Sequence, residues 1–362
     1  MKTIILFTIS LLFFSEAWAS GNDDFEDSKV FNKVVAISEG FELEITNKHG
    51  DIIFENWDKD SISVQVTISA QSADLKKLED IMKSVEIDFN AHSDYLAITT
   101  EWLNPGKSFK ADVMSFLGEQ SISVDYLIKL PKHIELDVTN RYGNIKMGNY
   151  DGKLKLDLSH GSISARKIKN ARSIKIKYGK LKIKEIEVGD ILARFSNVNI
   201  DKVGELDLNS SSSEIEIETA DKIVLKSFSD DIEIEELTKL QINSSASSIE
   251  IEKLKTSIKG EMKYGDLDVD EIANDFTSIT LNANSTDIDF TFKSDVALKY
   301  DIELEKGRSF TIPSKGNKLI KDSRIENTHK YVGSFSRGTM PESAPLIEIV
   351  AKGSYIEFDV EQ

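Results

Sequence analysis

Eight carboxylates are the side chains of this sequence whose type and spacing best suggest chemistry. They form four pairs, 17 or 18 residues apart, with one residue between the members of each: Glu216 and Glu218, Glu233 and Glu235, Glu250 and Glu252, Asp268 and Asp270. Oxygen ligands suit hard cations, so these are candidate calcium ligands. The alternative is a solvated acidic face that keeps strands from pairing with other chains, since no spacing matches a known calcium loop. Calcium is the only cofactor that the sequence suggests.

Other residues that commonly carry catalysis lack a catalytic pattern here. The five histidines are scattered, and none belongs to an HExxH motif. His49 and His160 occupy a repeat position that holds aromatic residues elsewhere, which favours packing over metal binding. The serines lack a Gly-x-Ser-x-Gly elbow, and the chain has no cysteine. We therefore predict no catalytic residues and a protein that is not an enzyme.

The acidic pairs belong to a repeat that runs through much of the chain. In each copy a short loop, often ending in Gly, precedes a strand in which apolar and polar residues alternate. The first apolar residue of each copy is the index residue: Ile145, Ile163, Leu181, Val198, Ile215, Ile232, Ile249, Leu267 and Ile288. Alternation predicts strands with one buried face, and the regular period predicts stacked coils. We expect an all-β, right-handed, single-chain β-solenoid, or β-helix, with coils of 17–18 residues.

Two positions of the repeat, three and two residues before the index residue, predict a corner in every coil. The residues at one position in successive coils form a column. The residues three before the index residue are aromatic in the early coils and small in most later ones: His49, Tyr142, His160, Tyr178, Phe195, Ser212, Ser229, Ala246, Tyr264 and Ser285. The next column holds Gly50, Gly143, Gly161, Gly179, Ser196, Ser213, Asp230, Ser247, Gly265 and Thr286. Because Gly tolerates left-handed backbone angles, we expect a tight turn at this second column.

From its first residue to its last, the sequence predicts five segments. Residues 1–19 have the layout of a secretory signal peptide, with Lys2, an apolar run and Ala17 and Ala19 around Trp18. The others are a disordered leader at 20–30, N-terminal strands with a helical insertion at 31–139, the regular β-solenoid at 140–292 and a C-terminal β cap at 293–362. No stretch is apolar for long enough to form a transmembrane helix.

The insertion and the cap contain finer signals. Ser72 is the expected N-cap of a helix over 73–85, followed by strands at 86–90, 95–101 and 121–130. We expect this insertion to shield the open edge of the first coil. In the cap we expect strands near 296–304, 308–312, 346–350 and 354–360, with loops over 313–345.

Charge divides the repeat region. Residues 141–190 hold 13 Lys and Arg against 5 Asp and Glu, whereas residues 201–275 hold 8 against 20. We expect Lys253 and Lys255 to neutralise the acidic pairs in part. The net charge of −17 argues against nucleic acid or anionic lipid as a general partner. Opposite charges within one chain also allow homo-association.

Two sequence motifs resemble those of a known family. Asn47-Lys48-His49-Gly50-Asp51-Ile52 with Trp57 after it, and Leu130-Pro131 leading into Asn140-Arg141-Tyr142-Gly143-Asn144-Ile145, look like the bacterial putative-adhesin β-solenoid family. The resemblance covers about residues 30–362 and implies export to the periplasm or cell surface. It provides no catalytic residues to carry over.

Three functions follow as hypotheses. The first is a noncatalytic, adhesin-like β-solenoid that acts as a binding protein or structural scaffold in the cell envelope, with a protein or polysaccharide surface as partner. The second is a carbohydrate-active β-helix resembling a polysaccharide lyase. The third is an envelope protein that associates with itself.

Overall fold

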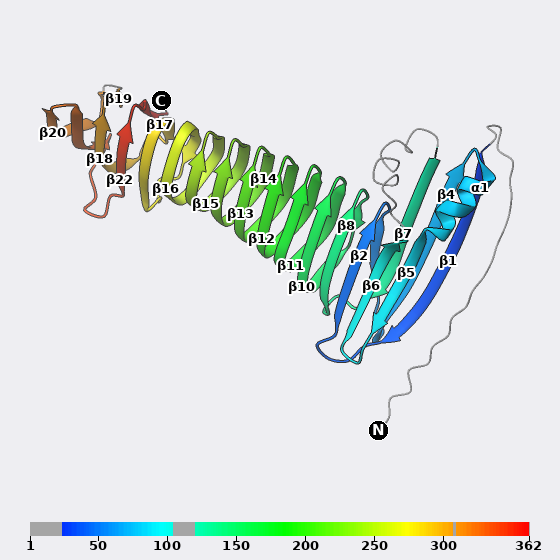
Figure 1. Cartoon of the computed structure of the whole chain (residues 1–362). Helices are drawn as coiled ribbons and strands as arrows, with labels where there is room; N and C mark the ends of the chain where they lie inside the picture. Colours follow the sequence, from blue (N-terminus) through cyan, green and yellow to red (C-terminus); the bar gives the residue numbers. More distant parts are fainter. Residues whose placement is uncertain (1–23, 104–119, 307–308, 362) are drawn as a thin grey trace. The chain divides into compact units, whose positions relative to one another are not determined.

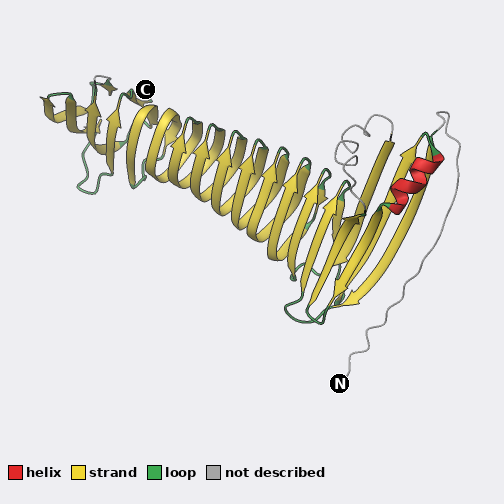
Figure 2. Ribbon diagram, in the orientation of Figure 1, coloured by secondary structure: helices red, strands yellow, loops and turns green. Residues whose placement is uncertain are grey.

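The computed structural model describes residues 24–103, 120–306 and 309–361 (Figure 1). The predicted signal peptide lies outside these residues. The chain forms two compact units, Met1–Lys182 and Ile183–Gln362. Strands dominate both units, and parallel coils stacked 17 or 18 residues apart confirm the predicted β-solenoid (Figure 2).

In the first unit, the early coil at 42–56 lies directly beside the coil that starts at 135. Strand β2 pairs in parallel with β8, so Leu43 is in register with Leu136, and β3 pairs with β9. Further parallel pairing joins β8 to β10, β10 to β11 and β11 to β9. The strands are β2 (Glu42–Lys48), β3 (Ile52–Asn56), β8 (Glu135–Arg141), β9 (Ile145–Lys146), β10 (Asn149–Ser159) and β11 (Ser162–Lys177).

The insertion between these two coils covers the edge of the first one, as expected. Strand β6 pairs with β2 and β7 pairs with β3, so both strands of the early coil have neighbours on each side. The first unit also contains β1 (Phe25–Ala36), β4 (Ser61–Ser72), α1 (Leu75–Lys83), β5 (Val85–Ala91), β6 (Tyr95–Trp102) and β7 (Gln120–Leu130). Antiparallel β1 and β4 extend the sheet beyond β7.

Two expectations for the first unit were wrong in detail. The leader at 20–30 was expected to be disordered, but β1 begins at Phe25 because its backbone pairs along the whole of β4. The helix starts two residues later than expected. Its N-cap is Asp74, whose carboxylate accepts a 3.0 Å hydrogen bond from the Lys77 amide, while Ser72 ends β4.

The second unit continues the repeat in register. Index residues Val198, Ile215, Ile232 and Ile249 align across four neighbouring strands and are buried. These strands are parallel and lie side by side (Figure 1). They are β13 (Asn197–Ser211), β14 (Glu214–Phe228), β15 (Asp231–Ser245), β16 (Ser248–Ile272) and β17 (Ser278–Phe292); β12 (Lys180–Arg194) crosses the boundary between the units.

The C-terminal segment adds strands on β17. They are β18 (Ala297–Glu305), β19 (Phe310–Thr311), β20 (Asn317–Ile325), β21 (Thr328–Ser336), β22 (Leu346–Lys352) and β23 (Ile356–Val360). The expectation of loops throughout 313–345 was wrong, because β20 and β21 form an antiparallel hairpin there. The hairpin is held by pairing with β18, and Phe335 is buried against the unit.

The corners are built differently from the prediction. The ten residues of the first column, from His49 to Ser285, are the ones in the left-handed region, with φ between 50° and 63°. The glycines of the second column serve close approach: a Cβ on Gly143 would lie 1.9 Å from the carbonyl oxygen of Gly50. The strained position therefore lies one residue earlier than expected, at residues other than glycine.

Candidate binding surfaces

The eight predicted carboxylates lie together on one face of the second unit. Glu216, Glu233 and Glu250 are in register across β14, β15 and β16, and Asp268 is in register with Asp289 of β17. Their partners two residues further along point to the same side, because side chains alternate along a strand. Seven of the eight are exposed, and Asp268 is half-buried. We call this set, with Asp289, the acidic face.

The acidic face has no cationic partner in the described structure. None of its carboxylates forms an ion pair within the described residues, although Glu216 accepts a 2.7 Å hydrogen bond from Asn199. Lys253 pairs with Glu271 at 3.1 Å, and Lys255 pairs with Glu236. The interpretation that these two lysines neutralise the rows was therefore wrong, because both turn to other carboxylates.

Burial, with repulsion between carboxylates, raises the pKa of two members of the acidic face. Burial, and then the charge of Asp289 and other neighbouring carboxylates, raises the pKa of Asp268. Burial and the charges of Asp359 and Asp287 raise the pKa of Asp289. Among the described residues, no three His, Asp or Glu side chains are grouped so that they could hold a metal ion.

A shallow groove with a volume of about 890 Å³ follows the corners next to the acidic face. Small residues of the left-handed column line it, including Ser212, Ser229 and Ala246, and carboxylates such as Asp231 and Asp266 flank them. Phe195 and Tyr264 belong to its first and last coils. The repeat predicts that these residues share one column, but it does not predict a groove. The surface is concave because small residues lie between two aromatic ones.

Beneath this groove, the second column of the corner holds polar side chains in place of glycine. These side chains form a ladder of hydrogen bonds. Asp230 accepts hydrogen bonds from the Ser210 and Ser227 hydroxyls, both 2.7 Å, and from the amides of Ser213 and Phe228. In other coils the equivalent hydroxyls donate to the carbonyl two residues earlier: Ser196, Ser213, Ser247, Thr286 and Ser354. These contacts satisfy polar groups that would otherwise be costly to bury.

In the first unit the corner column is an aromatic ladder. Ring centroids of His49 and Tyr142 are 5.0 Å apart, those of Tyr142 and His160 are 4.9 Å, and those of His160 and Tyr178 are 5.1 Å. Each pair is within 10° of parallel, and Trp102 meets His49 edge-on. Burial and the charge of Lys48 lower the pKa of His49 to about 4, so this ring is neutral near pH 7.

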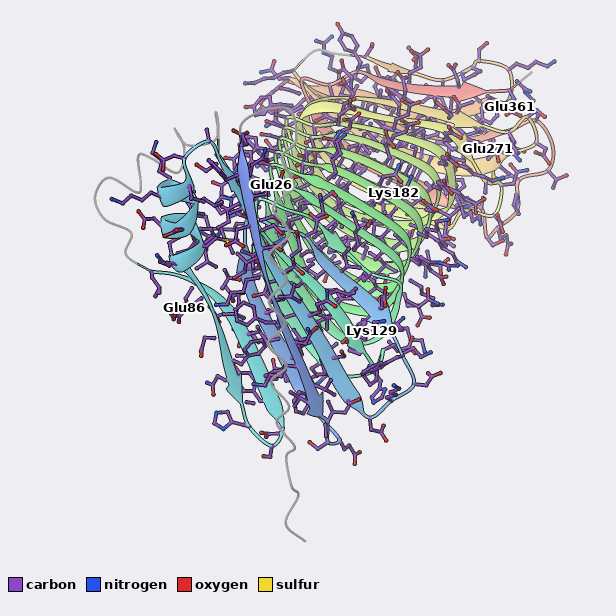
Figure 3. The ribbon with its side chains drawn as sticks, turned by 90° about the vertical axis from the view of Figure 1, so that its right-hand side faces the viewer. Glu26, Glu86, Lys129, Lys182, Glu271 and Glu361 are labelled. Carbon is purple, nitrogen blue, oxygen red and sulfur yellow. The ribbon has the colours of Figure 1, made fainter. Side chains whose placement is uncertain are left out.

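Basic side chains flank the aromatic ladder. Lys48, Arg141 and Lys177 precede three of its rings and share one row across β2, β8, β10 and β11. The Lys48 ammonium lies 5.9 Å from the Trp102 ring and 6.0 Å from the Tyr142 ring. Residues 162–182 contain eight Lys and Arg and no Asp or Glu. Figure 3 shows side chains projecting from the strands, with Lys182 labelled.

The family follows from a match to most of the chain. Residues 41–332 match the model of the Toastrack DUF4097 family. The chain belongs to this family. The predicted resemblance to adhesin-like β-solenoids is confirmed, whereas a comparison with curated proteins found no match. No helix among the described residues is long and apolar enough to cross a membrane.

Solved structures similar to this Toastrack chain have low sequence identity. A "putative cell adhesion protein" from Clostridium sporogenes is 12% identical, with a TM-score of 0.20, covering 92% of this chain and 100% of the other. A "putative lipid binding protein" from Parabacteroides distasonis is 15% identical, with a TM-score of 0.36, covering 72% and 95%. A "putative adhesin" from Parabacteroides merdae is 12% identical, with a TM-score of 0.32, covering 72% and 95%.

Proposed function

We propose that this chain is an exported, noncatalytic binding protein of the bacterial cell envelope that holds an anionic polysaccharide along the aromatic ladder of its first unit. One observation carries the proposal: the row of Lys48, Arg141 and Lys177 runs directly beside the ladder. In this row Lys48 and Arg141 are neighbours and Ser159 separates Arg141 from Lys177, so a linear polymer with carboxylates along its length can contact all three cations.

The ring geometry supports an oxygen-rich anionic ligand. Because the rings stack on one another, their outward parts are edges, and Tyr142 and Tyr178 remain 43% and 54% exposed. The edge of an aromatic ring is electropositive. The ring edges and the flanking cations therefore both attract a negatively charged ligand. A polyuronate presents both carboxylates and hydroxyls.

Binding to polygalacturonate tests the proposal, with neutral dextran as the control polymer. We expect the wild-type chain to bind polygalacturonate and not dextran, with weaker binding at high salt. Arg141→Glu with Lys177→Glu should weaken binding at least tenfold. The matched control is Lys202→Glu with Lys239→Glu, two exposed lysines of the second unit, which should bind as the wild type does. Equal binding by both double variants would remove the ladder from the proposal.

The same polymer separates binding from cleavage. A lyase would release unsaturated uronate ends, which absorb ultraviolet light. We expect no release during prolonged incubation with polygalacturonate. Release that depends on a residue of the chain would favour the lyase-like alternative.

A second proposal concerns the acidic face, which we propose associates with calcium ions. The absence of ion pairs to its carboxylates among the described residues supports it, and since no three of the described side chains are grouped to hold a metal ion, the association we propose is with the rows as a whole. Calcium should raise the Tm of the wild type, and this rise should be lost in a variant with Glu216, Glu233 and Glu250 changed to Gln. An identical response of the two proteins, or no response at all, would contradict it.

A further inference from the structure

The β20–β21 hairpin of the second unit has a surface that contrasts with the acidic protein carrying it. Among the described strands β20 pairs only with β21, so one of its edges has no strand beside it. Three aliphatic side chains of β20 are exposed: Leu319 by 47%, Ile320 by 69% and Ile325 by 72%. An exposed edge with apolar side chains readily accepts another chain.

The hairpin is also basic. Residues 315–337 contain six Lys and Arg and two Asp and Glu, in a chain of net charge −17. Lys330 pairs with Asp301 at 2.8 Å, whereas Lys318 and Lys321 form no ion pair with any described residue. A register shift at Ile320 places Lys318 opposite Ser334 and Lys321 opposite Val332. Both lysines therefore point to the same side of the hairpin, although they are three residues apart.

The complementary surface is on the same unit. The acidic face presents carboxylates in register from β14 to β17 that have no cationic partner among the described residues. Within one chain, no ion pair joins the hairpin to this face in the described structure. A contact between two copies can bring the hairpin of one against the acidic face of the other.

We propose that the β20–β21 hairpin of one copy binds the acidic face of a second copy. The two surfaces differ, so the contact is heterologous, and a pair of copies keeps one free hairpin and one free acidic face. Lys318 and Lys321 pair with carboxylates of the partner copy, while Ile325, opposite Thr328 and so on the same side as the two lysines, loses solvent contact. This interface is independent of the polysaccharide surface proposed above, which lies in the first unit.

Sedimentation velocity of residues 20–362 tests the proposal at low and at high salt. We expect larger species at low salt and a monomer at high salt, because salt screens exposed charges. Lys318→Glu with Lys321→Glu should weaken association at least tenfold, as should Glu233→Lys with Glu250→Lys. Lys226→Glu with Lys239→Glu, two exposed lysines that are in register with Asn243 and Ser257 and not with the acidic carboxylates, should associate like the wild type.

Mixing the two defective variants makes the test specific. Each alone lacks one half of the interface, but an equimolar mixture contains an intact hairpin on one protein and an intact acidic face on the other. We expect association to return in the mixture, and circular dichroism should show that each variant is folded. A wild type that stays monomeric at low salt, or a mixture that stays monomeric, overturns the proposal.

One further measurement separates the second copy from a membrane. If a monomeric wild type sediments with phosphatidylglycerol vesicles and the Lys318→Glu, Lys321→Glu variant does not, the hairpin is a lipid-binding surface and the proposal is wrong. Polygalacturonate binding by the hairpin variants should equal that of the wild type, so failure of one proposal is distinguishable from failure of the other.

Discussion

A Cβ atom on Gly161 would lie 1.9 Å from the carbonyl oxygen of Gly143 in the neighbouring coil. Real Cβ atoms do not approach backbone this closely, so the two coils would have to separate. We predict that Gly161→Ala lowers the free energy of unfolding by about 2 kcal/mol or more, in the range of strained core substitutions. Urea unfolding followed by circular dichroism measures the change.

The matched control for Gly161 is Gly338. A Cβ there would meet no atom within 4 Å, and its φ is not left-handed. Gly338→Ala should change the free energy of unfolding by less than about 0.5 kcal/mol. Equal losses at the two positions would mean that the neighbouring coil is not responsible.

Ala246 is a position where glycine should improve stability. Its φ is 56°, its side chain is exposed, and a left-handed backbone costs an L-residue roughly 1–2 kcal/mol. Glycine removes this strain but increases the entropy of the unfolded chain by a smaller amount. We predict that Ala246→Gly stabilises the protein by about 0.5–1 kcal/mol. Ala297→Gly, within β18 and without positive φ, should instead destabilise it. A loss at both sites would contradict the assignment of strain.

The repeat could be predicted because alternation and period act together. A shift of one residue would turn Ile232 to solvent and Glu233 to the core, so burial fixes the register. The positive φ could not be predicted at Tyr142, because the usual preference for glycine indicates Gly143. At Ala246 neither that residue nor Ser247 is a glycine. Contacts between coils, absent from any local pattern, decide which of the two residues bears the strain.

The C-terminal cap and the acidic face could also be predicted only in part from the sequence. Strand β20 reads as a loop because Lys, Ser and Asp surround its apolar residues, and pairing with β21 overrides that composition. The acidic rows were visible in the sequence, but the partners of Lys253 and Lys255 were not. Pairing of long side chains depends on which carboxylate lies within reach in three dimensions.

Asp230 should be sensitive to loss of charge without loss of size. Its two carboxylate oxygens accept four hydrogen bonds, three of them at Oδ2. Asparagine would turn an amide donor toward other donors, which leaves buried groups unsatisfied at a cost of about 1–3 kcal/mol. We predict that Asp230→Asn lowers the free energy of unfolding by that amount. Asp231→Asn, the exposed neighbour, should have little effect, and a comparable effect would argue against the ladder.

Asp268 and Glu271 should make opposite contributions to the pH dependence of stability. The pKa of Asp268 is raised, chiefly by burial and by the charge of Asp289. Between the unfolded and folded pKa values the folded protein then binds more protons, so this contribution falls as pH rises above about 4. Ion pairs with Lys293 at 3.0 Å and Lys253 at 3.1 Å lower the pKa of Glu271. Its contribution is present above its unfolded pKa and is lost as pH falls through the folded one.

Two amide variants separate these contributions. Relative to the wild type, Asp268→Asn should gain stability as pH rises from about 4 to 7, whereas Glu271→Gln should lose it over the same change. Urea unfolding at a series of pH values measures both differences against one wild-type curve. Lysines pair with Glu271, whereas Asp268 has carboxylates as its charged neighbours. The stabilities of the two variants relative to the wild type must therefore move apart as pH rises. Differences that stay parallel with pH would show that these charges are not in the environments described.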